Sequence, residues 1–175
     1  TLATGTTFGT GTTTVNVDDL VVSGGTPDIS GSGFTSTGAS PTISCAAGAL
    51  NITTLNVTTS TAVTSTNQLS VGTLNLGTGV TFDTGAQTVD VEDIVATGGT
   101  PIISGAGINV PNAGTPSITV NLGSLSITPG TLDLAGSVSL GVTGASTLTL
   151  KTLTLATGTT FGTGTTTCNV DDVVS

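Results

Sequence analysis

The chain has 175 residues, of which 35% are hydrophobic, and this length and apolar content suit one folded domain rather than a disordered polar tract. Its net charge is −9 with one basic residue, Lys151, which argues against binding to nucleic acid or to anionic membrane surfaces. Aromatic residues make up only 2% of the chain, so the core must consist of Val, Leu, Ile and Ala. No apolar run reaches the roughly 18 residues that a membrane helix needs.

From the amino terminus onward, the sequence repeats itself at a long period. Similar segments occupy residues 1–33, 75–107 and 154–175. Phe8, Phe82 and Phe161 are equivalent in these segments, so the first long period is 74 residues (82 − 8) and the second is 79 residues (161 − 82). One continuous domain is therefore expected, with long repeats at 1–74 and 75–153 and a partial one at 154–175. Because the last residues repeat the segment with which the chain begins, we expect the chain to be part of a longer tandem array.

A shorter period, of about 19–20 residues, follows the apolar pattern φ-x-φ-x-x-φ-x-φ, as in LSVGTLNL at 69–76 and LTLKTLTL at 148–155. Alternate residues of each triplet fall on opposite faces of a strand. The pattern predicts an all-β parallel solenoid whose rungs of about 19–20 residues begin at Val15, Phe34, Leu50, Leu69, Val89, Ile108, Val120, Leu148 and Cys168. Three pairs of inward residues are expected to stack on one another: Val15 with Val17, Leu69 with Val71, and Leu148 with Leu150.

Three regions fit the pattern poorly, namely 35–49, 109–119 and 138–147, and we interpret them as irregular corners or bulging loops. They contain Pro41, Pro111 and Pro116, and proline is confined to corners and strand ends because it cannot donate to a ladder. No segment has the 3.6-residue apolar period of a helix. Tandem β-sandwiches of about 75 residues are the alternative fold. The short period favours the solenoid, because it crosses the boundary between long repeats at 148–167 without a linker.

Acidic pairs are the sharpest local feature. They recur at equivalent positions of the long repeats, as Asp18 with Asp19, Glu92 with Asp93, and Asp171 with Asp172. Calcium is the metal that such oxygen ligands suit, but the pairs lie about four rungs apart and no calcium-binding loop motif is present. We therefore expect solvated turns and no cofactor, with calcium as the less favoured interpretation.

Lys151 and the two cysteines are the remaining candidates. Alignment of the rungs that begin at Leu148 and Cys168 predicts a structural ion pair between Lys151 and Asp171. Cys45 and Cys168 replace core valines about six rungs apart, too far for a disulfide within the chain. Buried thiols are the simplest interpretation, and an intermolecular disulfide in an oxidising, extracellular setting is the alternative.

Catalysis is not expected, because polysaccharide-cleaving solenoids use Arg, Lys or clustered carboxylates in a groove, and the chain has no Arg or His. Glycoside hydrolysis would require Asp83, Asp90 or Asp133 to lie close together. No small-molecule substrate is inferred. Ice binding requires a row of outward threonines, whereas the second position of successive rungs reads Asn16, Asn51, Ser70, Asp90, Asn121, Thr149 and Asn169. That column is closer to an Asn ladder, in which stacked amides bond along the axis.

The coil motifs at 69–88 and 148–167 resemble those of bacterial extracellular β-solenoid proteins, the adhesin and autotransporter-passenger group and the "β-strand repeat" surface proteins. The resemblance implies a structural role at the cell surface, as a fibre, sheath, surface layer or adhesive stalk. Uncapped rungs would then stack end to end into a homopolymer. An adhesin stalk or binding module and an ice-binding solenoid are the alternatives.

Overall fold

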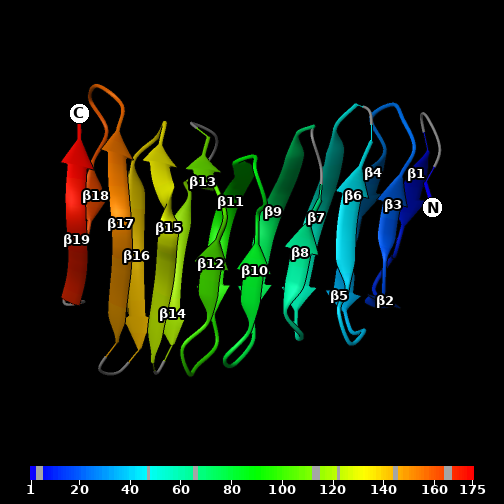
Figure 1. Cartoon of the computed structure of the whole chain (residues 1–175), viewed down its shortest axis with the longest axis horizontal. Coiled ribbons are helices and arrows are strands. Elements are labelled where there is room, and N and C mark those ends of the chain that lie inside the picture. Colours follow the sequence, from blue (N-terminus) through cyan, green and yellow to red (C-terminus); the bar gives the residue numbers. More distant parts are fainter. Residues whose placement is uncertain are drawn as a thin grey trace.

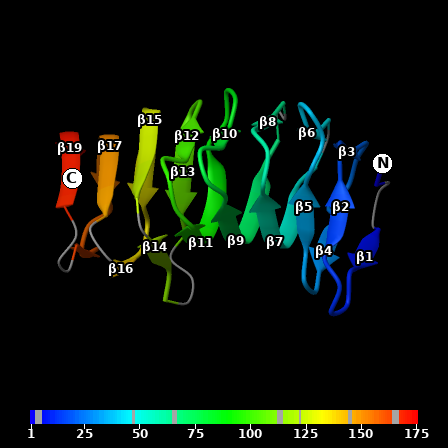
Figure 2. The ribbon, with the colours of Figure 1, turned by 90° about the horizontal axis from the view of Figure 1, so that it is seen from below.

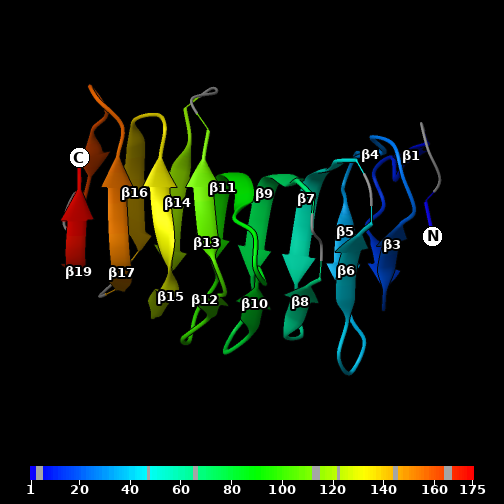
Figure 3. The same ribbon diagram turned by 45° about the horizontal axis from the view of Figure 1, so that its top comes forward.

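The computed structural model describes residues 1–2, 6–46, 48–64, 67–111, 115–121, 123–143, 146–163 and 167–175, and within them it is all-β without a helix. The strands are parallel and stack as a β-solenoid of about 7 turns. This confirms the predicted solenoid over the tandem sandwiches. Figure 1 shows strands of successive turns side by side along a rod with the two termini at opposite ends. The rotated views in Figures 2 and 3 show the same ladder.

The strands form three stacks, which we call faces A, B and C. Within a face each strand pairs in parallel with the strands one turn before and after it. Face A consists of β1 (Thr7–Gly9), β4 (Asp28–Ser30), β13 (Gly107–Val110) and one arm each of β7 (Leu50–Val57), β9 (Leu69–Leu76), β11 (Val89–Ala96), β15 (Ser124–Leu134), β17 (Thr147–Leu155) and β19 (Thr167–Val174).

The other two faces are built in the same way. Face B consists of β2 (Val15–Val17), β5 (Phe34–Ser36), β14 (Ser117–Asn121), β16 (Val138–Thr143), β18 (Phe161–Gly162) and the second arms of β7, β9 and β11. Face C consists of β3 (Leu20–Val22), β6 (Thr42–Cys45), β8 (Thr61–Val63), β10 (Thr81–Asp83), β12 (Ile102–Ser104) and the first arms of β15, β17 and β19.

The long apolar motif forms one strand that bends at its middle in β7, β9, β11, β17 and β19, whereas at 15–22 it forms two short strands, β2 and β3. In β9, residues 69–71 pair on face A and residues 74–76 pair on face B, and Gly72 and Thr73 form the corner between them. The alternate residues of both arms point into the bore and are at most 2% exposed. The two polar positions in φ-x-φ-x-x-φ-x-φ are therefore a corner of the rod, flanked by two core-facing arms.

The bore is filled by aliphatic side chains that stack along the axis. One column on face A contains Leu50, Leu69, Val89, Ile108, Leu132 and Leu153, each at most 4% exposed. Each of these side chains is covered by the rungs on both sides of it. Because no rung has a core of its own, the hydrophobic burial of each depends on its neighbours.

Two equivalent glycines allow neighbouring turns to approach closely. Gly33 and Gly107 have φ of 78° and 113°, a conformation that glycine adopts readily. A Cβ atom would lie 1.9 Å from the Thr54 carbonyl oxygen at Gly33 and 2.0 Å from the Thr131 carbonyl oxygen at Gly107. Both positions therefore require glycine for conformation and for space.

The turns are less uniform than the sequence predicts. The register partners Leu50 and Leu69 are closer in the sequence than the register partners Ile108 and Leu132, so the second of these turns is longer. The predicted rung starts pair correctly in three runs: Val15 with Phe34, Leu50 through Ile108, and Leu148 with Cys168. Between the runs the prediction is wrong, because Phe34 pairs with Leu55, Ile108 with Leu132, and Val120 with Val142.

The cause is that the long repeat does not contain a whole number of turns. From Phe8, face A returns at Ile29, Ile52 and Val71, and the chain then passes face B and reaches face C at Phe82, a total of three and two-thirds turns. From Phe82 the chain makes three turns to Leu150 and two further thirds to Phe161 on face B. Each long repeat thus begins on a different face.

Two further predictions need correction for this reason. Val15 with Val17, Leu69 with Val71, and Leu148 with Leu150 face the bore but lie on faces B, A and C, so they do not stack on one another. The regions interpreted as irregular contribute regular strands, namely β6, β14 and β16. Pro41, Pro111 and Pro116 lie next to strand ends, as expected. Residues 47, 112–114 and 144–145 of these regions lie outside the described part of the chain.

Candidate functional site: acidic bends and the face A groove

The three acidic pairs occupy the same local bend but three different corners of the rod. Asp18 and Asp19 connect face B to face C, Glu92 and Asp93 connect face A to face B, and Asp171 and Asp172 connect face C to face A. Among the described residues, no group of three or more His, Cys, Asp or Glu side chains is placed to hold a metal ion. The pairs therefore do not converge on a common calcium site in this chain.

The second carboxylate of a pair accepts hydrogen bonds from the next turn. Asp19 Oδ1 accepts from the backbone N–H of Thr42 at 3.0 Å and from its Oγ1 at 2.7 Å. Asp93 Oδ1 accepts from the backbone N–H of Ser117 and from its Oγ, both at 2.8 Å. These carboxylates cap the first residue of β6 and of β14. This role was not predicted from the sequence, although a signal for it is present: a Pro-Thr or Pro-Ser dipeptide, at 41–42 and 116–117, follows each acid by one turn of the coil.

The first acid of each pair has a different environment at each corner. Asp18 packs over Gly38, where a Cβ atom would lie 1.4 Å from Asp18 Oδ1, so a larger residue at 38 would displace this carboxylate. Glu92 lines a groove on face A. Asp171 pairs with Lys151 on the preceding turn. The first acid of the pair therefore does not have the same role in the three repeats.

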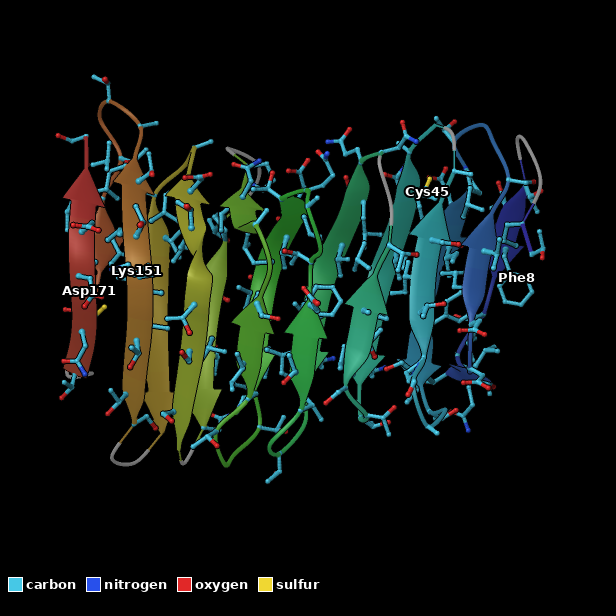
Figure 4. All side chains as sticks on the ribbon, in the orientation of Figure 1. Phe8, Cys45, Lys151 and Asp171 are labelled. Atoms are coloured by element: carbon cyan, nitrogen blue, oxygen red, sulfur yellow. The ribbon has the colours of Figure 1, made fainter. Side chains whose placement is uncertain are left out.

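Lys151 lies at the corner between faces C and A, directly beside the last acidic pair (Figure 4). Its Nζ is 3.1 Å from Asp171 Oδ2 and 4.0 Å from Asp172 Oδ2, and both side chains of the closer pair are largely solvated, at 48% and 68% exposure. The hydrogen bond to Asp171, and then the charges of Asp171 and Asp172, raise the pKa of Lys151. A solvated pair of this kind contributes little to folding stability and supplies no catalytic base.

Both cysteines are thiols on face C, near opposite ends of the rod. Cys45 is 1% exposed and pairs in register with Val22. Cys168 is half-buried in β19 over Leu148, and this partial burial raises the pKa of its thiol. Six turns separate the two on face C, about 29 Å at the usual strand spacing, which excludes a disulfide between them.

Polar ladders are present, but their members differ from the predicted column. Asn16 and Asn121 lie on face B, Asn51, Ser70 and Asp90 on face A, and Thr149 and Asn169 on face C. On face A two acid–amide pairs occur in the outward column: Asn51 Nδ2 donates to Asp28 Oδ1 at 2.6 Å, and Asn109 Nδ2 donates to Asp90 Oδ1 at 2.7 Å. Gln68 Nε2 also donates to Asp90.

Face B carries the ladder of stacked amides. There Asn75 Nδ2 donates to Asn56 Oδ1 at 2.8 Å, and Asn56 Nδ2 donates to Thr35 Oγ1 at 3.4 Å. These bonds join three successive turns along the axis. The physical idea of an amide ladder therefore applies, on a face and with residues that the sequence pattern did not identify.

A groove of about 560 Å³ extends along face A over β4, β7, β9 and β11. Its polar lining includes Asp28, Asn51, Ser70, Asp90 and Glu92. Such a surface can accept hydrogen bonds from hydroxyl or amino groups of a ligand. Asp133 lies two turns beyond Asp90 in the same outward column, and Asp83 is on face C, so the three acids considered from the sequence do not lie together.

Comparison with protein-family models, with curated proteins and with solved structures found no match. Among the described residues there is no helix of the length and apolarity that membrane crossing demands. The function must therefore be inferred from the fold, the acidic bends and the groove on face A.

Proposed function

We propose that this chain is a structural repeat protein of the extracellular surface, which forms or extends a fibre, sheath or surface layer by end-to-end stacking. The main support for the proposal is that the three copies of the long repeat begin on three different faces of the rod, with Phe8, Phe82 and Phe161 on faces A, C and B. A repeat that can begin on any of the three faces can extend the rod from any of them. This property suits a modular axial structure.

The pairing that joins successive rungs supports axial growth. Within the described chain β19 pairs only with β17, and where no further turn covers a rung its apolar column is open: Val173, which continues the column of Leu132 and Leu153, is 63% exposed whereas Leu153 is 4% exposed. An edge of this kind presents unpaired backbone groups together with an uncovered apolar column. Another strand can add to it by the same pairing that joins the rungs within the rod.

Negative-stain electron microscopy of the purified chain tests the proposal. Rods longer than one molecule should appear and lengthen with protein concentration, because stacking is bimolecular. Short particles of one length at every concentration would exclude end-to-end stacking. Electrophoresis with and without reductant tests the extracellular setting, since a dimer band that reductant removes would indicate a bridge between copies through Cys168.

A binding module, such as an adhesin stalk, is the second candidate, and the acidic groove on face A favours it. A ligand bound there should be released when Ser70→Trp fills the groove, whereas the same substitution should leave axial stacking unchanged. The ice-binding alternative has less support. Outward positions on the described faces read Asn51, Ser70 and Asp90 on A, Asn56, Asn75 and Val95 on B, and Ser126, Thr149 and Asn169 on C.

A further inference from the structure

We propose that face B is a lateral interface through which two copies of this chain pack side by side. The inference goes beyond the proposed axial growth, because it concerns the flank of the rod and not its ends. It rests on the turns from β5 to β14, each of which is covered by a paired strand on both sides within the described chain. Such a contact supplies the sideways cohesion that a sheath or surface layer needs.

Face B differs from the other two faces in charge. On face A, Asp28, Asp90 and Asp133 point outward, and on face C Asp83 does so. The strands and arms that make up face B contain no charged residue, namely β2, β5, β14, β16, β18 and residues 55–57, 74–76 and 94–96. Its central outward column, in register from turn to turn, reads Asn16, Thr35, Asn56, Asn75, Val95, Thr119 and Gly141.

This distribution of charge determines the flank by which a second copy can approach. Two copies that each carry a net charge of −9 repel one another, and contact through face A or face C would bring like carboxylates into the interface. Of the three described faces, face B alone avoids this cost. The nearest acids lie at its two borders, in the bends that contain Asp18 and Asp93. Asp93 already accepts two hydrogen bonds within its own rod.

The polar side chains of face B are bonded along the rod, so a second sheet can cover them at low cost. Asn75 Nδ2 donates to Asn56 Oδ1 at 2.8 Å, and Asn56 Nδ2 donates to a backbone carbonyl of the preceding turn at 3.2 Å. Beside this column, the Thr58 and Thr97 hydroxyls donate to carbonyl groups of the preceding turn at 2.7 and 3.0 Å. Because these bonds survive when water is removed, burial of the face does not leave the groups unpaired.

The shape of face B suits contact with an identical face. Rows of small, uncharged side chains with stacked amides are the surfaces that pack dry against a second sheet. The seven positions of the column span about 29 Å at the usual strand spacing, and five residues across a strand, such as 73–77, span about 13 Å. The resulting area of about 400 Å² on each copy is less than the roughly 800 Å² of a standard stable interface. Two single chains should therefore associate weakly, at high concentration.

Small-angle X-ray scattering of the full chain over a concentration series tests the interface. Side-by-side packing increases the cross-sectional radius of gyration of the rod, whereas end-to-end stacking increases its length at constant cross-section. We expect the cross-section to increase with protein concentration. The increase should be larger at high salt, because screening weakens the repulsion between two acidic rods.

Val95 and Val21 provide a matched pair of variants. They occupy the same position of the long repeat, but Val95 points outward on face B and Val21 points outward on face C. Val95→Asp should weaken lateral association about tenfold or more, because it brings like charges into the contact. Val21→Asp should change it less than about twofold. Circular dichroism checks the fold, and Thr119→Asp on face B with Thr149→Asp on face C repeats the comparison at a second place.

A cross-section that stays constant at every concentration would overturn the proposal, and so would equal effects of the two substitutions on the two faces or an association that salt weakens. The result is separable from the proposed function. If rods lengthen at constant cross-section, axial stacking stands and the lateral interface is wrong. If the cross-section increases and no rod exceeds one molecule in length, the lateral interface stands and end-to-end stacking by this chain is wrong.

Discussion

The bends of β11 and β19 are built from the same local sequence, yet their surroundings are opposite. In β11, Ile94 is fully buried and Asp93 accepts hydrogen bonds from Ser117 of the next turn. In β19, the equivalent Val173 is 63% exposed, and no strand of the described chain lies above Asp172. The difference shows that a rung acquires its stability from the turns on either side of it. The local motif defines the bend, and stacking supplies the burial.

Truncation of a core residue should give the largest contrast between a central rung and the last one. Leu74, which is fully buried, has neighbours on both sides, so Leu74→Ala should cost about 2–5 kcal/mol of unfolding free energy. Val173→Ala should cost about 0.5 kcal/mol or less, because its side chain is mostly solvated. Urea unfolding measures both. Equal losses would mean that the last rung is covered in solution.

Addition of one methyl group at a close contact between turns should rank next. Gly107→Ala places a Cβ atom against the Thr131 backbone at a positive φ, and we expect a loss of about 2 kcal/mol or more. Gly158→Ala, also at positive φ but with open space around it, should cost about 1 kcal/mol. Thermal melts compare the two, and a smaller loss at Gly107 than at Gly158 would contradict the close approach.

Removal of the cap should separate the two acidic bends directly. Asp93→Ala leaves the Ser117 N–H and hydroxyl without their acceptor and should cost about 1–3 kcal/mol in chemical unfolding. Asp172→Ala removes no cap within the chain and should leave stability nearly unchanged. If the two variants lose the same stability, the hydrogen bonds at Ser117 are not what stabilises the β11 bend.

The Lys151 pair should give the smallest effect on stability, and its pH dependence has a defined sign. Its pKa is raised above the ordinary value of 10.5, mainly by the hydrogen bond to Asp171. The contribution of this ion pair to folding stability is therefore complete below the ordinary pKa of 10.5 and is lost as the pH rises through the folded-state pKa of Lys151. Lys151→Gln should be slightly less stable than the parent at pH 8, and the difference should vanish in strong alkali or at high salt. A difference that grows with pH would contradict the pairing.

The solenoid and its corners could be predicted from the sequence because they depend on local alternation. The two triplets in LSVGTLNL at 69–76 are inward arms, and the polar pair between them is a corner. The face on which a motif lies could not be predicted, because every corner suits the same motif and the unequal lengths of successive turns accumulate along the chain. The caps at Asp19 and Asp93 were missed because their partners lie one full turn away.

The central claim is that the long repeat shifts phase, and a cysteine cross-link tests it most directly. In a background with Cys45→Val and Cys168→Val, Asp28→Cys with Asn51→Cys places both thiols at register partners on face A, at the usual spacing of about 4.8 Å between paired strands. The rung starts predicted from the sequence, Phe34 and Leu50, would instead pair residue 51 with Thr35, which lies on face B. We predict that the 28–51 pair forms an intrachain disulfide and that Thr35→Cys with Asn51→Cys does not. The reverse result would contradict the phase shift.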